Sequence, residues 1–323
     1  MKAAILYKAG EVPQYGDIAD PLPYSENEIV MTIKAASVKN LDKARASGRH
    51  YASYTQFPAI TGTDATGTLP DGTRIYAHGI TGTIAEKTII NKNKYTPLPH
   101  NIDFITAAAL PNAVIGAAMA LRYRAQMKAG HTVLVNGATG VTGQLAVQIA
   151  KHYGAARIIA TGRNAEQLEK LKALGADITI SLKDDDDTII SAIKGIHAAT
   201  PIDIVIDYLW GHPIELIIKA MKGEGLHHYT HRVKICTVGS MAGEHIELAS
   251  GTLRSSAIEL LGSGFGSLSE QELESFNNEI LPEMFRLSAG GHLQIDTQTA
   301  SLQDIASVWN QEIPAGKRLV IVI

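Results

Sequence analysis

The segment from Thr132 to Asn164 constrains the fold more than any other part of the chain. It opens with Thr132-Val133-Leu134-Val135, an apolar run typical of a strand buried on both faces. Glycines follow at 137, 140 and 143, and from Val141 apolar residues recur every four positions, which predicts a helix. A second apolar run, Arg157 to Thr161, predicts another strand. The segment therefore predicts a strand–turn–helix–strand unit.

The turn after the first strand suits a phosphate group. It contains A-x-G-x-x-G where the dinucleotide fingerprint has G-x-G-x-x-G, with the strand before it and the helix after it. Glycines turn sharply and leave no Cβ between backbone and ligand, and the N–H groups of the helix start favour a pyrophosphate. We expect a dinucleotide to contact Gly137, Ala138, Thr139, Gly140, Val141, Thr142 and Gly143. The alternative is a purely structural unit.

The end of the second strand indicates which dinucleotide the chain would bind. Folds that prefer NAD usually place an acidic residue there for the ribose 2′-hydroxyl. This chain has Thr161, Gly162, Arg163 and Asn164 instead. The 2′ position of the ribose would therefore face the positive charge of the arginine. Because arginine pairs well with phosphate, the sequence predicts NADPH or NADP; the alternative is an arbitrary surface arginine.

The order of the predicted elements indicates an α/β domain. Strands are expected at 132–136, 157–161, 177–181, 203–207, 233–238 and about 257–262, with helices between them. Such alternation predicts a doubly wound parallel sheet whose ligand lies at the carboxyl ends of the strands. Val238, Gly239 and Ser240 follow the fifth strand and are therefore expected at the cofactor.

The flanking segments predict a second domain. Residues 1–114 show short apolar runs between turns and no helix-length periodicity before Phe104, which indicates a β-rich domain. After 267 we expect one helix at 270–288, a shorter one near 302–312 and a terminal strand at 318–323. Because that strand needs a sheet, residues 267–323 are expected to complete the first domain. The 115–266 domain is then an insertion, with a cleft between the two.

Composition excludes several classes of protein. The 323 residues carry a net charge of −3 with both signs mixed, which argues against a nucleic acid or a membrane as partner. The apolar stretch 105–121 is interrupted by Pro111 and predicts buried helices, and no signal peptide is evident, so we expect a cytoplasmic protein. A single cysteine, Cys236, excludes an internal disulfide and a four-cysteine zinc site.

Two polar clusters are candidates for metal sites. His227, His228 and His231 are close in sequence, but a polar loop is the favoured interpretation. The acidic run 184–187 lacks the glycine and terminal glutamate of a calcium-binding EF-hand loop. No metal is expected.

Further segments match a known family in its order and over nearly the full length. They are Met1–Tyr7, Ala36–Asp42 with Ser47-Gly48, Gly62–Gly67, Ala108–Pro111, Gly137–Gly143 and Gly316–Val320. On these the chain resembles the medium-chain dehydrogenase/reductase superfamily and its zinc-independent quinone oxidoreductase branch. The resemblance implies a Rossmann domain inserted into a GroES-like catalytic domain. It also implies a homodimer that pairs the last strands of two nucleotide sheets, here near Ile258–Leu261.

The resemblance also implies that the catalytic zinc of related enzymes is absent. Zinc-dependent members have a cysteine ligand where this chain has Lys39, and a Gly-His-Glu turn where it has Gly62-Thr63-Asp64. A protonated lysine is no zinc ligand, and a threonine cannot replace an imidazole. Lys39-Asn40 also stands where the branch usually has asparagine and proline.

The implied reaction transfers a hydride from the nicotinamide to a small quinone or α,β-unsaturated carbonyl compound. Lys39 or Asn40 would stabilise the developing oxyanion, and water, Tyr51 or Tyr54 would supply a proton. Asn112 would bind the nicotinamide region or cap a helix. The alternative for Lys39 is an ion pair with Asp42 or Asp64, and for each tyrosine simple packing. The alternative functions are a metal-free alcohol or ketone reductase and a non-catalytic NADPH-binding protein.

Overall fold

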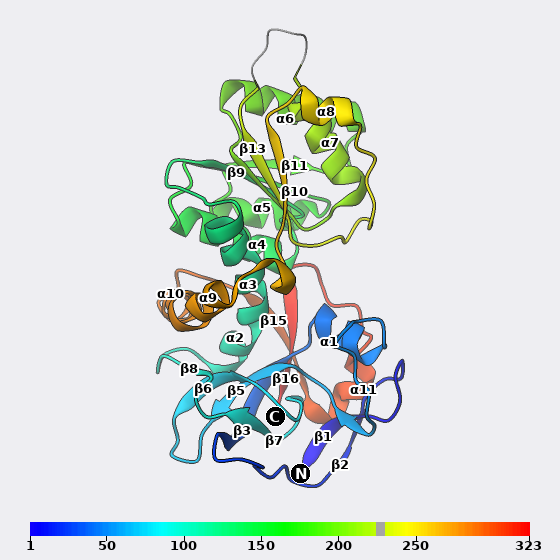
Figure 1. Cartoon of the computed structure of the whole chain (residues 1–323), viewed down its shortest axis with the longest axis vertical. Coiled ribbons are helices and arrows are strands. Elements are labelled where there is room, and N and C mark those ends of the chain that lie inside the picture. The colour runs from blue at the N-terminus through cyan, green and yellow to red at the C-terminus, as the bar shows by residue number, and fades with distance from the viewer. Residues whose placement is uncertain (224–229) are drawn as a thin grey trace. The chain divides into compact units, whose positions relative to one another are not determined.

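A computed structural model describes residues 1–223 and 230–323 of the chain (Figure 1). The chain divides into two compact units. Residues 1–112 and 277–323 form a β-rich unit, and residues 113–276 form an α/β unit. The chain therefore leaves the β-rich unit once and returns to it near its C-terminal end.

The α/β unit contains a six-stranded parallel sheet, which confirms the predicted fold class. Its strand order is β11-β10-β9-β12-β13-β14, so the direction of strand addition reverses between β9 and β12. In such sheets the ligand crevice lies outside the carboxyl ends of the strands at this reversal. The strands are β9 (Thr132–Asn136), β10 (Arg157–Gly162), β11 (Ile178–Ser181), β12 (Ile204–Asp207), β13 (Val233–Thr237) and β14 (Ile258–Gly262).

Helices connect these strands as the apolar periodicity predicts. Leu134 and Val205 of the central strands pack with Ile193 and Ile217 of helices in one buried cluster. The helices are α3 (Pro111–Met119), α4 (Val141–His152), α5 (Ala165–Leu174), α6 (Asp186–Ala199), α7 (Gly211–Met221), α8 (Ser250–Arg254) and α9 (Glu270–Ser275); Ala120–Arg124 forms a π-helical turn and Phe265–Ser267 a 3₁₀ turn. Burial on both faces explains why the two central strands, β9 and β12, are almost entirely apolar.

The β-rich unit is built around a seven-stranded sheet and a three-stranded sheet. The larger has the order β15-β16-β3-β5-β6-β8 with β7 also paired to β3, and the smaller is β2-β1-β4. The strands are β1 (Lys2–Leu6), β2 (Gln14–Asp17), β3 (Glu28–Ser37), β4 (Ala59–Ile60), β5 (Asp64–Thr68), β6 (Arg74–His78), β7 (Lys87–Asn91), β8 (Tyr95–Pro97), β15 (Asp296–Ser301) and β16 (Lys317–Val322).

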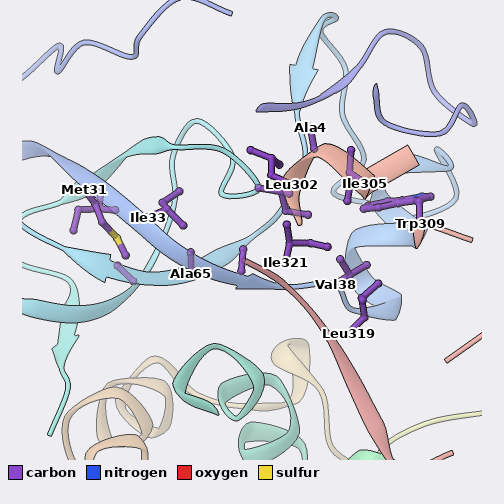
Figure 2. Close-up of a cluster of buried hydrophobic side chains, with 14 of the residues drawn as sticks. Ala4, Met31, Ile33, Val38, Ala65, Leu302, Ile305, Trp309, Leu319 and Ile321 are labelled. Atoms are coloured by element: carbon purple, nitrogen blue, oxygen red, sulfur yellow. The ribbon is translucent and has the colours of Figure 1, made fainter. Parts of the chain in front are cut away.

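The C-terminal segment completes this unit. β16 pairs antiparallel with β3, so that Val320 lies opposite Ser37. Figure 2 shows Ile321 and Trp309 in the same buried cluster as Ile33 and Ala4 from the first strands. Burial of these apolar side chains drives the return of the chain to its first unit.

Several elements differ from the sequence predictions. Helix α1 (Asn40–Ala46) is not predicted, because seven residues are too few to show helical periodicity. Strand β15 is also missed, because Asp-Thr-Gln-Thr-Ala-Ser has no apolar alternation. The single helix predicted at 270–288 is instead α9, a π-helical turn at Phe276–Ile280 and α10 (Leu281–Ala289). The helix predicted near 302–312 is only a 3₁₀ turn (Leu302–Asp304) and α11 (Ile305–Val308).

The apolar stretch 105–121 forms buried helices, as predicted. It contains most of α2 (Phe104–Ala109) and all of α3, whose first residue is Pro111. Ala107, Ala108 and Ala109 are fully or almost fully buried. No helix in the described parts of the chain is long and apolar enough to cross a membrane.

Candidate cofactor and active sites

The glycine turn between β9 and α4 has the backbone that a phosphate cradle needs. Gly137 has a φ of +85°, a conformation that side chains rarely adopt. A Cβ on Gly143 would lie 2.5 Å from the Gly137 carbonyl oxygen, so the helix can pack on the turn only with glycine there. Gly140 is the N-cap of α4 and supplies no side-chain acceptor, which leaves the first N–H groups of the helix for a ligand. The turn therefore fits a pyrophosphate.

The end of β10 lies beside this turn. Thr161 and Gly162 are buried, and a Cβ on Gly162 would collide with the Thr139 side chain, so the strand end and the turn are closely packed. Arg163 is exposed and makes no hydrogen bond or ion pair with the described residues. Asn164 instead caps α5, because its Oδ1 accepts a hydrogen bond from the Gln167 N–H at 3.0 Å. Of the two polar side chains, Arg163 is the one available to a ligand.

The loop after β13 meets the same edge of the sheet. The backbone N–H groups of Val238 and Gly239 both donate to the Asp207 carbonyl oxygen, at 2.7 and 3.3 Å. The Ser240 hydroxyl donates to Glu244 at 2.7 Å. The structure thus places the expected cofactor residues that follow β9, β10 and β13 together at the carboxyl end of the sheet. Asn112 belongs to the β-rich unit, where its Oδ1 accepts from Arg318 Nη2 at 3.5 Å.

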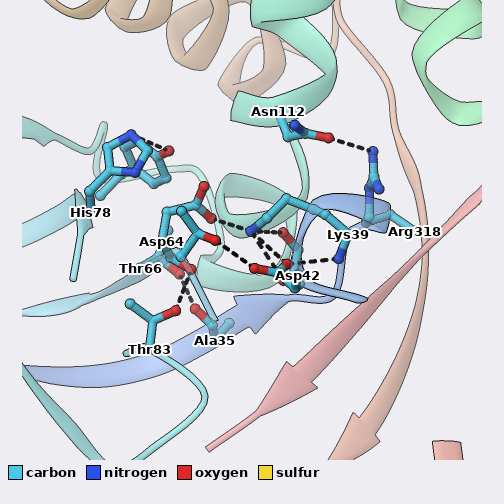
Figure 3. Close-up of polar contacts among 12 residues, drawn as sticks. Ala35, Lys39, Asp42, Asp64, Thr66, His78, Thr83, Asn112 and Arg318 are labelled. Atoms are coloured by element: carbon cyan, nitrogen blue, oxygen red, sulfur yellow. Dashed lines mark hydrogen bonds and ion pairs between the residues drawn. The ribbon is translucent and has the colours of Figure 1, made fainter. Parts of the chain in front are cut away.

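Lys39 lies in the β-rich unit inside a buried group of charged side chains (Figure 3). Its side chain is 1 % exposed, and its Nζ lies 2.7 Å from Asp64 Oδ1 and 3.4 Å from Asp42 Oδ2. The ammonium also donates to the Ser37 carbonyl oxygen at 3.2 Å. Three acceptor groups thus surround the three N–H donors of the ammonium. These are the ion pairs that the sequence offers as the alternative to a catalytic role.

Lys39 and Asp64 are both buried, and each favours the charged form of the other. Burial alone would lower the pKa of Lys39, but the Asp42 and Asp64 carboxylates raise it above its ordinary value. Burial alone would raise the pKa of Asp64, yet the Lys39 ammonium is the main cause that brings it below its ordinary value. At neutral pH the lysine is therefore protonated and has no lone pair for a metal ion.

Tyr54 is connected to this group through Arg45. The Arg45 guanidinium lies 4.7 Å from the centroid of the Tyr54 ring and donates to the Thr63 hydroxyl, which in turn donates to Asp42 at 2.6 Å. Burial raises the pKa of Tyr54 to about 12. The hydroxyl is therefore a weaker acid than that of an exposed tyrosine.

The other two expected catalytic residues lie at the surface of the unit. Tyr51 is 88 % exposed, and its ring packs against the His50 ring with centroids 4.1 Å apart. Asn40 is the first residue of α1 and its side chain is exposed. The structure therefore places Asn40 beside the buried Lys39 group and leaves Tyr51 outside it.

Arg318 is a residue of this region that the sequence reasoning missed. Its Nε is shielded from solvent and has no hydrogen-bond partner among the described residues. Burial lowers the pKa of Arg318, and the carboxylates of Asp42 and Asp64 oppose that shift. The available signal was a charged residue directly before the apolar segment Leu319–Ile323.

Of the three histidines considered as metal ligands, only His231 lies in the part of the chain that the structure describes. His231 Nε2 lies 2.7 Å from Asp203 Oδ1, while His227 and His228 fall outside the residues that the structure describes. Within residues 1–223 and 230–323, no three histidine, cysteine or acidic side chains are grouped to hold a metal ion. Cys236 is fully buried in β13.

Comparison with known proteins shows which proteins the chain is similar to. A family model described as zinc-binding dehydrogenase matches residues 141–280. The chain is 34 % identical over 176 residues to the chloroplastic NADPH-dependent alkenal/one oxidoreductase of Arabidopsis thaliana, a match that covers 48 % of this chain and only 45 % of that relative. It is 26 % identical over 360 residues to a probable NADPH-dependent quinone reductase of Emericella nidulans, with 96 % of both chains covered.

A solved structure shares the fold. The quinone oxidoreductase of Thermus thermophilus, whose complex with NADPH was also solved, superposes with a TM-score of 0.77 at 22 % identity and 100 % coverage of both chains. The sequence matches and the shared fold extend over both units of the chain. In sequence and fold the chain is therefore similar to quinone and alkenal/one oxidoreductases, in line with its resemblance to the quinone oxidoreductase-like branch of the medium-chain dehydrogenase/reductase superfamily.

Proposed function

We propose that this protein is an NADPH-dependent oxidoreductase that reduces quinones or α,β-unsaturated carbonyl compounds. The observation that carries the proposal is the uncapped glycine turn at the strand-order reversal of the sheet, together with Arg163, which directly follows β10 and is unpaired among the described residues. The names of the relatives from Arabidopsis thaliana and Emericella nidulans support the cofactor and the substrate class.

The cofactor would be held by residues of the α/β unit. The N–H groups of the Gly137–Gly143 turn and of the start of α4 would receive the pyrophosphate, and Arg163 would pair with the 2′-phosphate. Val238, Gly239 and Ser240 would line the same edge of the sheet. When bound, NADPH supplies a hydride from its nicotinamide ring. An exposed arginine without a carboxylate partner among the described residues suits NADPH better than NADH, because only NADPH carries the 2′-phosphate.

Of the two proposed oxyanion partners we favour Asn40, because its side chain is exposed at the start of α1 whereas Lys39 is buried. Lys39 already faces Asp64, Asp42 and Ser37, so a bond to substrate would replace one of these contacts. We assign Lys39 to holding the loop that presents Asn40 at the start of α1. The Asn40 amide would then hydrogen-bond the substrate oxygen on which negative charge develops. Water or Tyr51 would supply the proton, since a pKa of about 12 makes Tyr54 a poor donor.

The proposed reaction does not use a metal ion. The Lys39 ammonium occupies the place that the resemblance assigns to a cysteine ligand, and its ion pairs keep it protonated. The family model described as zinc-binding covers residues 141–280, a range without Lys39 and without Thr63-Asp64. Its description therefore gives no support for zinc at this loop.

Steady-state turnover tests the proposal directly. We expect the protein to oxidise NADPH, followed by its absorbance, with p-benzoquinone or methyl vinyl ketone and not with cyclohexanone, and we expect EDTA to have no effect. Turnover of cyclohexanone alone would instead indicate a ketone reductase. NADPH binding without oxidation by any activated alkene or quinone would indicate a non-catalytic protein, and either result would refute the proposal.

Two variants test the assigned residues. Arg163→Ala should raise KM for NADPH about tenfold or more while KM for NADH, the internal control, stays within about twofold. Asn40→Ala should lower kcat with p-benzoquinone by about 100-fold at nearly unchanged NADPH affinity, as expected for loss of an oxyanion donor. An equal effect of Arg163→Ala on both cofactors would contradict the 2′-phosphate assignment.

The proposal includes a homodimer formed through β14. This strand ends the six-stranded sheet and is paired on one side only, with β13, among the described residues. Its Leu260 is 37 % exposed, and an apolar edge strand of this kind favours pairing with another chain. The cytoplasmic location expected from the sequence stays a prediction, which cell fractionation would test.

A further inference from the structure

Three polar side chains are completely buried at the carboxyl ends of neighbouring strands. They are Asn136 on β9, Thr161 on β10 and Asp207 on β12, each with 0 % of its surface exposed. In the sheet register Asn136 lies opposite both Thr161 and Asp207. Buried polar groups are costly unless they are hydrogen-bonded, and these three are bonded to one another.

The hydrogen bonds run in a single direction from the glycine turn to the carboxylate. The Gly137 N–H donates to Thr161 Oγ1 at 3.3 Å, and the Thr161 hydroxyl donates to Asn136 Oδ1 at 2.6 Å. The Asn136 amide then donates to Asp207 Oδ1 at 2.8 Å. Because the only proton of the hydroxyl goes to the amide oxygen, the amide nitrogen must face a group that accepts, which a carboxylate does.

Asp207 also holds the turn that follows β12. Its carboxylate accepts hydrogen bonds from the N–H groups of Leu209 at 3.0 Å and Trp210 at 3.1 Å. Trp210 has φ 53° and ψ −158°, a backbone conformation that is costly for any residue with a side chain. The carboxylate thus stabilises a turn that would otherwise relax.

The same turn packs on the glycine turn. A Cβ on Gly137 would lie 2.9 Å from the Leu209 side chain, so Leu209 covers this glycine closely. One end of the hydrogen-bond chain therefore holds the backbone of Gly137, and the other end holds the residue that packs on it. The same three side chains therefore hold both the backbone of the glycine turn and the residue that packs on it.

We propose that Thr161, Asn136 and Asp207 form a network that positions the glycine turn for the dinucleotide, with Asn136 and Asp207 as positioning residues that act through Gly137 and Leu209. The inference rests on the proposed cofactor and assigns these two residues a role in its affinity. A turn that is already held in its bound conformation loses less entropy on binding, so the network raises affinity.

Direct binding of NADPH to the full chain tests the network. Asp207→Asn and Thr161→Val keep the shape of the side chains. The first replaces one accepting carboxylate oxygen by an N–H donor, so that the bond from Trp210 or those from Asn136 and Leu209 are lost, and the second removes the hydroxyl between Gly137 and Asn136. Each should weaken NADPH affinity, measured by calorimetry, about tenfold, because each removes a buried hydrogen bond that orients the turn. Thr161→Ser keeps the hydroxyl and should bind like the wild type.

Asp177→Asn is the matched control. Asp177 Oδ2 accepts a hydrogen bond from the Ile158 N–H at 2.7 Å, at the amino ends of β10 and β11 and so at the end of the sheet away from the glycine turn. This variant should lower thermal stability and leave NADPH affinity within about twofold of the wild type. A purely structural role of Asp207 would lower the thermal stability of Asp207→Asn and, as in the control, leave its NADPH affinity unchanged.

A double variant shows whether the two ends act as one unit. Asp207→Asn combined with Thr161→Val should bind NADPH no more weakly than the worse single variant, because residues of one network are not additive. Unchanged affinity in both single variants would overturn the network and leave the proposed function standing, whereas a wild type that binds neither NADPH nor NADP would overturn both. If Asp207→Asn does not fold, Thr161→Val against Thr161→Ser gives the same decision.

Discussion

Lys39 shows how buried neighbours set the role of a single side chain. An isolated buried ammonium would lose its proton, but two carboxylates within 3.4 Å keep it charged. The same contacts occupy its donors. Its value to the protein is therefore structural first, since it joins α1 to β5 through Asp42 and Asp64.

Replacing this lysine should destabilise the fold strongly. Lys39→Met leaves two carboxylates buried near each other without this cation, which typically costs about 3–5 kcal/mol of the free energy of unfolding. Urea unfolding would measure the change. Lys43→Met is the control, because Lys43 is half-buried in the same helix without an ion pair among the described residues. A loss below that of the control would show that the ion pairs contribute little.

The contribution of this ion pair should depend on pH at both extremes. The pKa of Asp64 is below its ordinary value of 3.8, so its share of stability is present above that pH and is lost as the pH falls further. The pKa of Lys39 is above its ordinary value of 10.5, so its share is present below that pH and is lost as the pH rises further. In Lys39→Met the cation no longer opposes burial, so the pKa of Asp64 should rise and the variant should lose stability, relative to the wild type, as the pH increases above 3.8. Urea unfolding at several pH values checks this, and a difference in unfolding free energy that shrinks from acid to neutral pH would contradict the assigned charges.

At the level of elements, the turn from β12 into α7 combines strain with packing. Trp210 is the N-cap of α7 and has a positive φ, while its ring packs against the buried cluster of the α/β unit. Burial of a large aromatic ring offsets a backbone strain of about 1–3 kcal/mol. The side chain therefore stays although glycine would suit the backbone better.

Two substitutions of Trp210 separate the backbone strain from the contribution of the buried ring. Trp210→Ala and Trp210→Gly both remove the ring, but only glycine adopts the observed φ without strain. The glycine variant should be more stable than the alanine variant by about 1–2 kcal/mol in thermal or urea unfolding. The same pair at Leu253, in α8, should show the opposite order, because glycine is unfavourable in a helix. The same order at both sites would refute the strain.

At the level of the whole molecule, the two edge strands of the α/β sheet are the candidate surfaces for the proposed dimer. β14 and β11 are the two end strands of the sheet. The family resemblance assigns the dimer contact to β14, which carries a partly exposed apolar residue, Leu260. Edge strands with exposed apolar residues tend to pair with other chains.

A lysine at this edge should prevent the dimer. Leu260→Lys places a charge where two strands would meet, and light scattering should then show a monomer in place of a dimer. Thr179→Lys adds the same charge to β11, at the opposite edge, and should leave the dimer intact. A dimer in both variants would place the interface elsewhere.

The sequence by itself determined the α/β unit and its glycine turn. The strands of this unit are apolar runs separated by periodic helices, so local pattern and final structure agree from Thr132 to Leu174. The turn residues were also evident, because a φ of +85° at Gly137 and the close contact at Gly143 both require glycine. These features depend on residues that are near one another in the sequence.

The tertiary structure alone decided the surroundings of the polar residues. Asp64 lies 25 residues from Lys39, and Asp207 lies 71 residues from Asn136, so neither pairing is encoded in a local pattern. β15 likewise became a strand because it pairs with β16, although its own sequence has no strand pattern. The charge of a buried group and the pairing of a polar strand are set by whatever surrounds them after folding, and a sequence window contains only a small part of those neighbours.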